Sequence, residues 1–209
     1  GISAIVGIMT SIGVIRSSFV SNFMDLGASS FTITRERTDF GMATRQPLIT
    51  PYQSGLFVKS YSFPARVGRY MEVSDQAQVR YGSEKTNPNV QIEAIDGDYM
   101  TIYGRNLLAG RSFSKSEIQS GSKVVLLGND VVEGIKLSPL SAIGKTVQVD
   151  GQSFLIAGVL EPKGSSSGQP DNVVFCPYQT ALQFLPTTSS NTQILVEPFR
   201  ADDVSLAIA

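Results

Sequence analysis

The chain opens on a strongly apolar stretch. Its first fifteen residues, GISAIVGIMTSIGVI, carry no charge, and the small residues Ser3, Gly7 and Ser11 recur at every fourth position. This spacing is typical of helices that pack within membranes, whereas the length of the run also suits an ordinary buried helix. The pattern predicts one long helix over residues 1–26, ended by Gly27, and leaves both environments open.

Beyond this stretch, alternation of apolar and polar positions predicts many short strands. The expected strands are 31–37, 66–73, 78–82, 90–95, 123–128, 172–176 and 192–197. A turn at Ser74-Asp75 is expected to separate the second strand from the third. The clearest hairpin covers residues 145–161, because Asp150-Gly151 interrupts two alternating runs.

Capping residues predict short helices between the strands. Thr50 and Pro51 begin a helix over 51–60, whose inner face is expected to carry Leu56, Phe57 and Tyr61. The other expected helices are 96–104 closed by Gly104, 114–120 with the capping pair Ser114 and Glu117, one capped by Asn129, 177–185 after Pro177, and one begun by Asp202 and Asp203. The predicted class is α+β.

The organisation suggests more than one compact part. The polar segment SEKTNPN, residues 83–89, marks an expected internal boundary. The apolar run at Gly1 and the short helix that stops at Ala209 both look like incomplete elements. We therefore expect an excised portion of a larger protein.

Composition excludes several classes of function. The 209 residues include 17% charged side chains and have a net charge of -1, which lacks the basic field of a nucleic-acid-binding protein. The sequence has no histidine, which removes Ser-His-Asp and Cys-His catalysis and histidine-ligated zinc. Its single cysteine allows neither an internal disulfide nor a multi-cysteine metal site.

Two segments superficially resemble ligand sites. The strand KVVLLG, ended by Gly128, leads into a helix in the manner of a phosphate loop, but the motif lacks further glycines and a phosphate-binding lysine. Asp96 and Asp98 have the spacing of some calcium loops, without the remaining oxygen ligands. We interpret Gly128 as a tight turn and the two aspartates as helix-capping residues.

The remaining candidates are weaker. Cys176 ends an apolar strand and is expected to be a buried thiol. Lys163 precedes the serines at 165–167, but serines between glycines are typical of a flexible loop rather than a Ser-Lys dyad. A local basic patch of Arg35, Arg37 and Arg45 is interleaved with acidic residues, as on a solvated strand face. No catalytic, cofactor-binding or metal-binding residue is assigned, no cofactor is expected, and an enzyme is not expected.

Ordered motifs over 92–180 resemble the periplasmic core domain of MacB-like (FtsX-type) ABC transporter permeases. Three segments carry the resemblance: G-x-x-L-x-x-G-R-x-F at Gly104, Leu107, Gly110, Arg111 and Phe113; the strand KVVLLG at 123–128; and IGKTVQVDGQSFLIAGVL at 143–160, with Gly144, Lys145 and Phe154. The opening stretch is also similar to the end of that family's first transmembrane helix.

The resemblance implies two lobes. The expected parts are a transmembrane end and stalk at 1–26, a porter-like α/β lobe of βαβ units split between 27–87 and 189–209, and an inserted mixed α/β lobe at 88–188. A stalk of that length reaches ~39 Å as a helix.

The resemblance also implies a function. It predicts a non-catalytic periplasmic domain of an inner-membrane protein, anchored through flanking helices, that couples ATP-driven transmembrane movement to periplasmic work. Implied partners are a cytoplasmic ATPase subunit or domain, a second permease copy or paralogue, and a periplasmic adaptor or lipoprotein, with contacts expected on loops 38–49 and 163–171. The alternative from the residues is a self-contained periplasmic domain that binds a small ligand or peptide.

Overall fold

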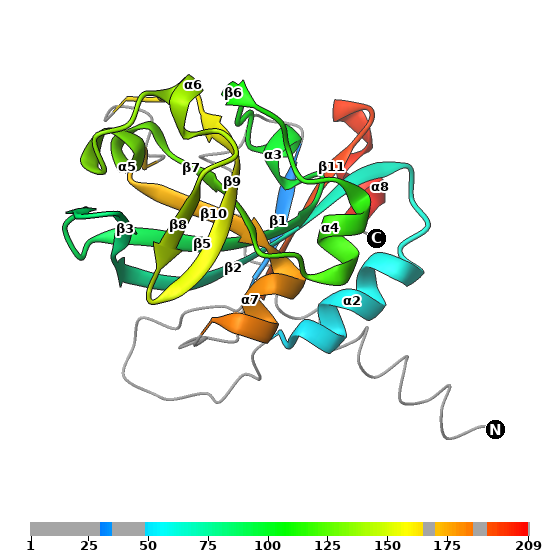
Figure 1. Ribbon diagram of the computed structural model, residues 1–209. Helices are drawn as coiled ribbons and strands as arrows, with labels where there is room; N and C mark the ends of the chain where they lie inside the picture. Colours follow the sequence, from blue (N-terminus) through cyan, green and yellow to red (C-terminus); the bar gives the residue numbers. More distant parts are fainter. Residues whose placement is uncertain (1–29, 35–48, 165–169, 186–191, 209) are drawn as a thin grey trace, which may run out of the picture. The chain divides into compact units, whose positions relative to one another are not determined.

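The structure, a computed structural model, describes residues 30–34, 49–164, 170–185 and 192–208 (Figure 1). These residues form two compact units: unit 1 draws on Gly1–Arg69, Gly97–Ile102 and Ser190–Ala209, and unit 2 on Tyr70–Asp96 and Tyr103–Ser189. Helices and strands occur in both, which confirms the expected mixture of α and β structure.

Membrane-spanning structure was expected only near the start of the chain. The predicted helix over 1–26 lies outside the described residues. Among the helices of the described ranges, none has both the length and the apolar character required to cross a bilayer.

Unit 1 packs short helices against a small set of strands. Its elements are β1 (Phe31–Ile33), α2 (Pro51–Ser60), the first residues of β2 (Ala65–Ala77), α3 (Tyr99–Ile102), β11 (Thr192–Pro198), a 3-10 turn at Ala201–Asp203 and α8 (Val204–Ile208). Strands β1 and β11 are antiparallel, and β2 is the next strand after β11. Ile33, Ile194 and Val196 are almost fully buried and form the centre of its core.

Helix α2 begins as its sequence predicts. The Thr50 hydroxyl accepts a hydrogen bond from the Gln53 backbone N–H, while the Gln53 side chain accepts one from the Thr50 N–H. The predicted inner face is wrong at Leu56, whose side chain is exposed. Ser54 is buried in its place, because it lies on the same helical face as Phe57 and Tyr61, three and seven residues further on.

Unit 2 contains most of the strands. They are β3 (Val79–Tyr81), β4 (Glu84–Lys85), β5 (Val90–Gly97), β6 (Leu107–Gly110), β7 (Val124–Leu127), β8 (Thr146–Val149), β9 (Gln152–Leu160) and β10 (Val173–Pro177), together with the rest of β2. The strand order is β2-β5-β10-β7-β9-β8-β3-β4, with β6 beside β9. Parallel pairs β5–β10 and β7–β9 alternate with antiparallel ones, so the sheet is mixed.

Short helices connect these strands. They are α4 (Lys115–Ser120), α5 (Asn129–Gly134), α6 (Pro139–Ala142) and α7 (Tyr178–Phe184). The capping pair Ser114 and Glu117 of α4 is confirmed, and Gly121 ends that helix in the left-handed region at φ 67°. The central strands β7 and β10 are buried along their whole length, as expected for strands covered on both faces.

The β8–β9 hairpin is confirmed. The strands are antiparallel, with Val147 opposite Phe154 and Val149 opposite Gln152. Asp150 and Gly151 both have positive φ, 47° and 81°, which is the backbone that a two-residue hairpin of this kind requires.

The predicted turn at Ser74-Asp75 is wrong, because β2 runs through it. Met71, Val73 and Ala77 of this strand are all buried in the core of unit 2. A single continuous strand buries these side chains together, and this packing outweighs the local turn preference of Ser74-Asp75.

Residues 70–87 lie in unit 2. The lobe bounds that the resemblance implies, with 27–87 in the first lobe, remain a prediction. The expected boundary segment 83–89 contains β4, which forms a hairpin with β3. The buried Thr86 hydroxyl accepts a hydrogen bond from the Val79 N–H. The polar composition of the segment therefore reflects a hairpin of this unit.

Candidate functional site

In the turn between β7 and α5, backbone N–H groups are already bonded to backbone carbonyls of the protein itself. The Gly128 N–H donates to the Val173 carbonyl, and the Asp130 N–H donates to the Asp171 carbonyl. A Cβ atom on Gly128 would lie 2.0 Å from the Asp171 carbonyl oxygen. Glycine is required here by close backbone approach, in agreement with the interpretation as a tight turn.

The charges around this turn also oppose an anion. Burial raises the pKa of Asp130, and the neighbouring carboxylates of Asp171 and Glu133 raise it further. The predicted cap at Asn129 is wrong: Gly128 is the N-cap, and the Asn129 amide donates to the Glu133 carboxylate. Gly128 is the last residue with extended backbone, at φ -66° and ψ 156°, so Asn129 is already the first residue of α5.

Asp96 lies within β5, so its interpretation as a helix-capping residue is wrong, because the strand continues to Gly97 and only Asp98 follows it. The Asp98 N–H donates to the Val67 carbonyl, and its own carbonyl accepts from Ile102, so that Asp98 leads directly into α3. Within the described ranges, no group of three or more acidic, cysteine or histidine residues is arranged to hold a metal ion.

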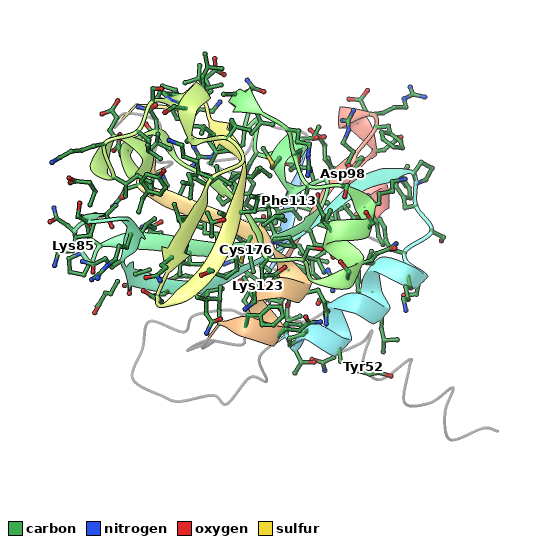
Figure 2. All side chains as sticks on the ribbon, viewed as in Figure 1. Tyr52, Lys85, Asp98, Phe113, Lys123 and Cys176 are labelled. Carbon is green, nitrogen blue, oxygen red and sulfur yellow. The ribbon has the colours of Figure 1, made fainter. Side chains whose placement is uncertain are left out.

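Cys176 is completely buried in the core of unit 2 (Figure 2). Burial raises the pKa of its thiol to about 12, and the charge of Glu93 contributes in the same direction. Burial likewise raises the pKa of Tyr70, with a smaller contribution from Glu93. Both groups are protonated at neutral pH, so neither is an activated nucleophile.

Of the Ser-Lys dyad that was considered as an alternative, the structure describes the lysine but not the serines. Lys163 lies on the described chain and its backbone N–H donates to the Asp171 carboxylate, as does the Gly164 N–H. Serines 165–167, and Arg35, Arg37 and Arg45, lie outside the described residues, as does most of the expected contact loop 38–49.

Arg105 and Asp171 form a buried polar contact that no sequence pattern predicts. The Arg105 Nη2 donates to the Pro170 carbonyl at 2.6 Å, and its Nη1 lies 3.7 Å from the Asp171 carboxylate. The Arg105 guanidinium also lies over the Phe175 ring, 5.6 Å from its centroid. The 66 positions between Arg105 and Asp171 leave no local sequence signal for this pairing.

The first motif of the family resemblance, which runs from Gly104 to Phe113, forms a turn that leads to the N-terminal cap of α4. Gly110 has φ 81°, and a Cβ atom there would lie 2.3 Å from the Ala157 carbonyl oxygen. Both terminal nitrogens of Arg111 donate to the Glu117 carboxylate at 2.8 Å. The hydrogen bond from Arg111 is the main reason that the pKa of Glu117 falls to about 2.

The third segment of the family resemblance, residues 143–160, holds the start of the β8–β9 hairpin. The Gly144 N–H donates to the Ile156 carbonyl, and the Ile156 N–H donates to the Lys145 carbonyl. Phe154 is buried in the core, and the Lys145 ammonium lies 5.1 Å from the Tyr81 ring centroid. These motif residues position backbone and core.

A shallow hollow of about 300 Å³ lies between β6 and α6. It is lined by Leu108, Ala109, Ser138, Pro139 and Leu140, none of which is ionisable. Leu108 is 49% exposed and Leu140 is 82% exposed. Sequence patterning did not single out this surface, because its residues come from segments 30 positions apart.

The domain is built on a large mixed sheet. The motifs that carry the family resemblance form turns, a helix cap and part of the apolar core of this domain. A family model described as "MacB-like periplasmic core domain" matches residues 1–209. The chain belongs to this family. It is a periplasmic domain of the kind found in MacB-type ABC transporter permeases, as the sequence resemblance predicted.

Curated relatives agree with this assignment. The chain is 32% identical over 111 residues to the macrolide export ATP-binding/permease protein MacB of Chlorobium phaeobacteroides, covering 53% of this chain and 16% of that protein. It is 30% identical over 108 residues to the pyoverdine export ATP-binding/permease protein PvdT of Pseudomonas savastanoi pv. phaseolicola, with 51% and 16% covered. The chain thus spans a small fraction of these relatives' length.

Solved structures support the fold. The periplasmic region of MacB from Actinobacillus actinomycetemcomitans superposes with a TM-score of 0.69 at 17% identity, covering 90% of this chain and 84% of that one. The extracellular domain of the ABC-type transporter YknZ from Gram-positive bacteria gives a TM-score of 0.55 at 20% identity, with 76% and 77% covered.

Proposed function

We propose that this domain couples ATP-driven movement of a transporter's membrane helices to work in the periplasm and performs no chemistry itself. The observation that carries the proposal is the family match over residues 1–209. The relatives are named as ATP-binding/permease proteins, and this chain matches 16% of their length. The ATPase activity is therefore proposed to reside in a separate, cytoplasmic subunit or domain.

The proposed partners follow from this role. They are the cytoplasmic ATPase, a second permease copy or paralogue, and a periplasmic adaptor or lipoprotein. We place the protein in the inner membrane, with residues 1–26 as the end of its first transmembrane helix and a stalk. Loops 38–49 and 163–171 are the proposed contact regions.

The two compact units support an assignment of lobes. Unit 1 combines residues from both ends of the chain, as a split porter-like lobe would, and unit 2 supplies the intervening lobe. In unit 2, the strands β7 and β10 are buried throughout. A densely packed interior resists compression and transmits displacement, which a mechanically moved body requires.

Spin-label distances in the complete permease, reconstituted with its ATPase, test the coupling role. Tyr52→Cys or Lys85→Cys provides an exposed label site in unit 1 or unit 2, respectively (Figure 2). The native Cys176 is buried and remains unlabelled. We expect the distance between labels on the two permease copies to change when ATP binds.

A matched control keeps both labels within one unit. In a Lys85→Cys/Leu140→Cys variant, both sites are exposed residues of unit 2, and their distance within one copy should stay constant. Inter-copy distances that are insensitive to nucleotide at both label sites would contradict the coupling role. A small ligand that raises the thermal midpoint of the chain would instead favour the binding-domain alternative.

A further inference from the structure

Strand β6 has an open edge on the surface of unit 2. It pairs with β9 on one side, and no other described strand pairs with it. An unpaired strand edge presents backbone N–H and C=O groups that another strand can bond. In Figure 1, β6 lies near α6, in agreement with the contacts between the two elements.

A β-bulge turns one residue of this edge outward. Leu107 is opposite Leu160 and Ala109 is opposite Val159, so Leu108 has no partner residue in the ladder. A bulge of this kind leaves the extra residue unpaired and redirects its side chain. The result is an exposed leucine at the open edge of β6.

The neighbouring helix completes an apolar hollow. Leu140 on α6 and Leu108 on β6 both line the hollow of about 300 Å³. The polar groups of Ser138 are satisfied within α6, because its hydroxyl and its N–H both bond Ser141. The lining therefore offers apolar contact without a charge to select an ionic group.

These features define the kind of molecule that fits. An open edge pairs with an extended backbone, and an uncharged apolar hollow accepts an apolar side chain from it. The hollow is small: five residues line it, which is room for an individual side chain, whereas a standard protein–protein interface involves roughly 20–30 residues a side. A short segment therefore fits better than a second copy of this chain.

We propose that the β6 edge, with Leu108 and Leu140, is a docking site for an extended, uncharged, apolar segment of a partner protein. The segment adds as a strand beside β6 and places one side chain in the hollow. This site is independent of the proposed coupling role and has its own test.

The test uses the ¹⁵N-labelled 209-residue chain and the blocked peptide acetyl-Thr-Val-Thr-Leu-Thr-Val-amide as the probe. We expect saturable shifts of backbone amide signals that are centred on 107–110 and 138–142. Leu108→Asp and Leu140→Ser should each weaken peptide binding at least tenfold. Both side chains are exposed, so the rest of the spectrum should remain that of the folded chain.

Two controls make the result specific. Leu155→Asp changes another partly exposed leucine of unit 2, outside the hollow, and should leave binding unchanged. Two peptides methylated on alternate backbone nitrogens should differ in affinity at least tenfold, because only one of them retains the N–H groups that face β6.

Other outcomes would overturn the proposal. Absence of saturable shifts, or shifts centred elsewhere, excludes this docking site. Equal binding of the two methylated peptides excludes strand addition. Concentration-dependent self-association that Leu108→Asp abolishes would identify a second copy of the chain as the occupant instead.

Discussion

At the scale of single residues, charged and small side chains in the matched motifs stabilise turns. Arg111 holds Glu117, and Glu117 in turn caps α4 by accepting from the Ser114 N–H. Gly110 and Gly128 allow backbone atoms to approach more closely than any side chain would permit. These residues therefore stabilise the local conformation of the chain.

Glu117→Gln should reduce stability most at neutral pH. The pKa of Glu117 is about 2 in the folded protein, below its ordinary value of about 4.3. Its charge therefore stabilises the fold above about pH 4.3, and this stabilisation is lost as the pH falls toward 2. Urea unfolding of the wild type and the variant at pH 7, 4 and 2.5 measures the difference.

The size of this effect should be modest, because more than half of the Arg111 side chain is exposed to solvent. Arg111→Gln is the matched control and should show the same pH trend. A stability difference that stays constant between pH 7 and 2.5 would contradict the assigned role of the Glu117 charge.

Gly128→Ala should destabilise unit 2 by about 3 kcal/mol, because the new Cβ meets backbone that cannot rotate away. Gly82→Ala is the comparison: Gly82 has φ 57° with open space around it, so only backbone strain of about 1 kcal/mol is expected. Denaturant unfolding of both variants checks the order. Equal losses would show that the contact with Asp171 is relieved by local movement.

At the scale of elements, Asp171 connects three parts of unit 2. Its carboxylate accepts from the backbone N–H groups of Lys163 and Gly164, which follow β9, and its carbonyl accepts from the Asp130 N–H of α5. Arg105, which follows α3, reaches the same segment through Pro170. A single residue thus joins connections that are distant in the sequence.

Asp171→Ala should cost about 3 kcal/mol of stability, because it leaves the Arg105 guanidinium buried beside no carboxylate. Adding Arg105→Met should recover part of this loss, since the stranded charge is then removed. Glu84→Ala, which breaks the exposed pair with Lys136, should cost less than about 1 kcal/mol. Urea unfolding measures all three, and an additive double variant would contradict the coupling of Arg105 and Asp171.

At the scale of the whole molecule, each unit has its own apolar core. Ile33, Ile194 and Val196 belong to the core of unit 1, while Phe154 and Cys176 belong to that of unit 2. Strand β2 contributes residues to both units. The rate at which a reagent reaches a core residue therefore reports on the opening of the unit that contains this residue.

Cys176 should react with a thiol reagent only when unit 2 opens. Its thiol is fully buried and its pKa is raised to about 12, so the native state offers almost no thiolate. We expect labelling at pH 8 to be slow and to accelerate with urea in step with unfolding. A Tyr52→Cys variant, with an exposed second thiol, should label at once, and fast labelling of the wild type would contradict the burial.

Much of the local structure was predictable because its causes are local. Thr50 with Pro51, Ser114 with Glu117, and Asp150-Gly151 each act within a few residues, and all three predictions are confirmed. The turn predicted at Ser74-Asp75 failed because the packing of β2 depends on partners elsewhere in the chain. Local preference is a small free energy compared with the burial of several core side chains.

The candidate sites show the same difference between local patterns, which the sequence predicts, and contacts between distant segments, which it does not. Ordered motifs sufficed for the sequence to identify the family, and its composition excluded histidine-dependent chemistry. No sequence signal predicted the contact of Arg105 with Asp171, or that Leu108 and Leu140 line the same hollow. The sequence alone determined the family and the local caps, because each motif and each cap consists of residues close in sequence. The tertiary structure decided which distant segments pair, because only folding of the whole sheet brings those segments into contact.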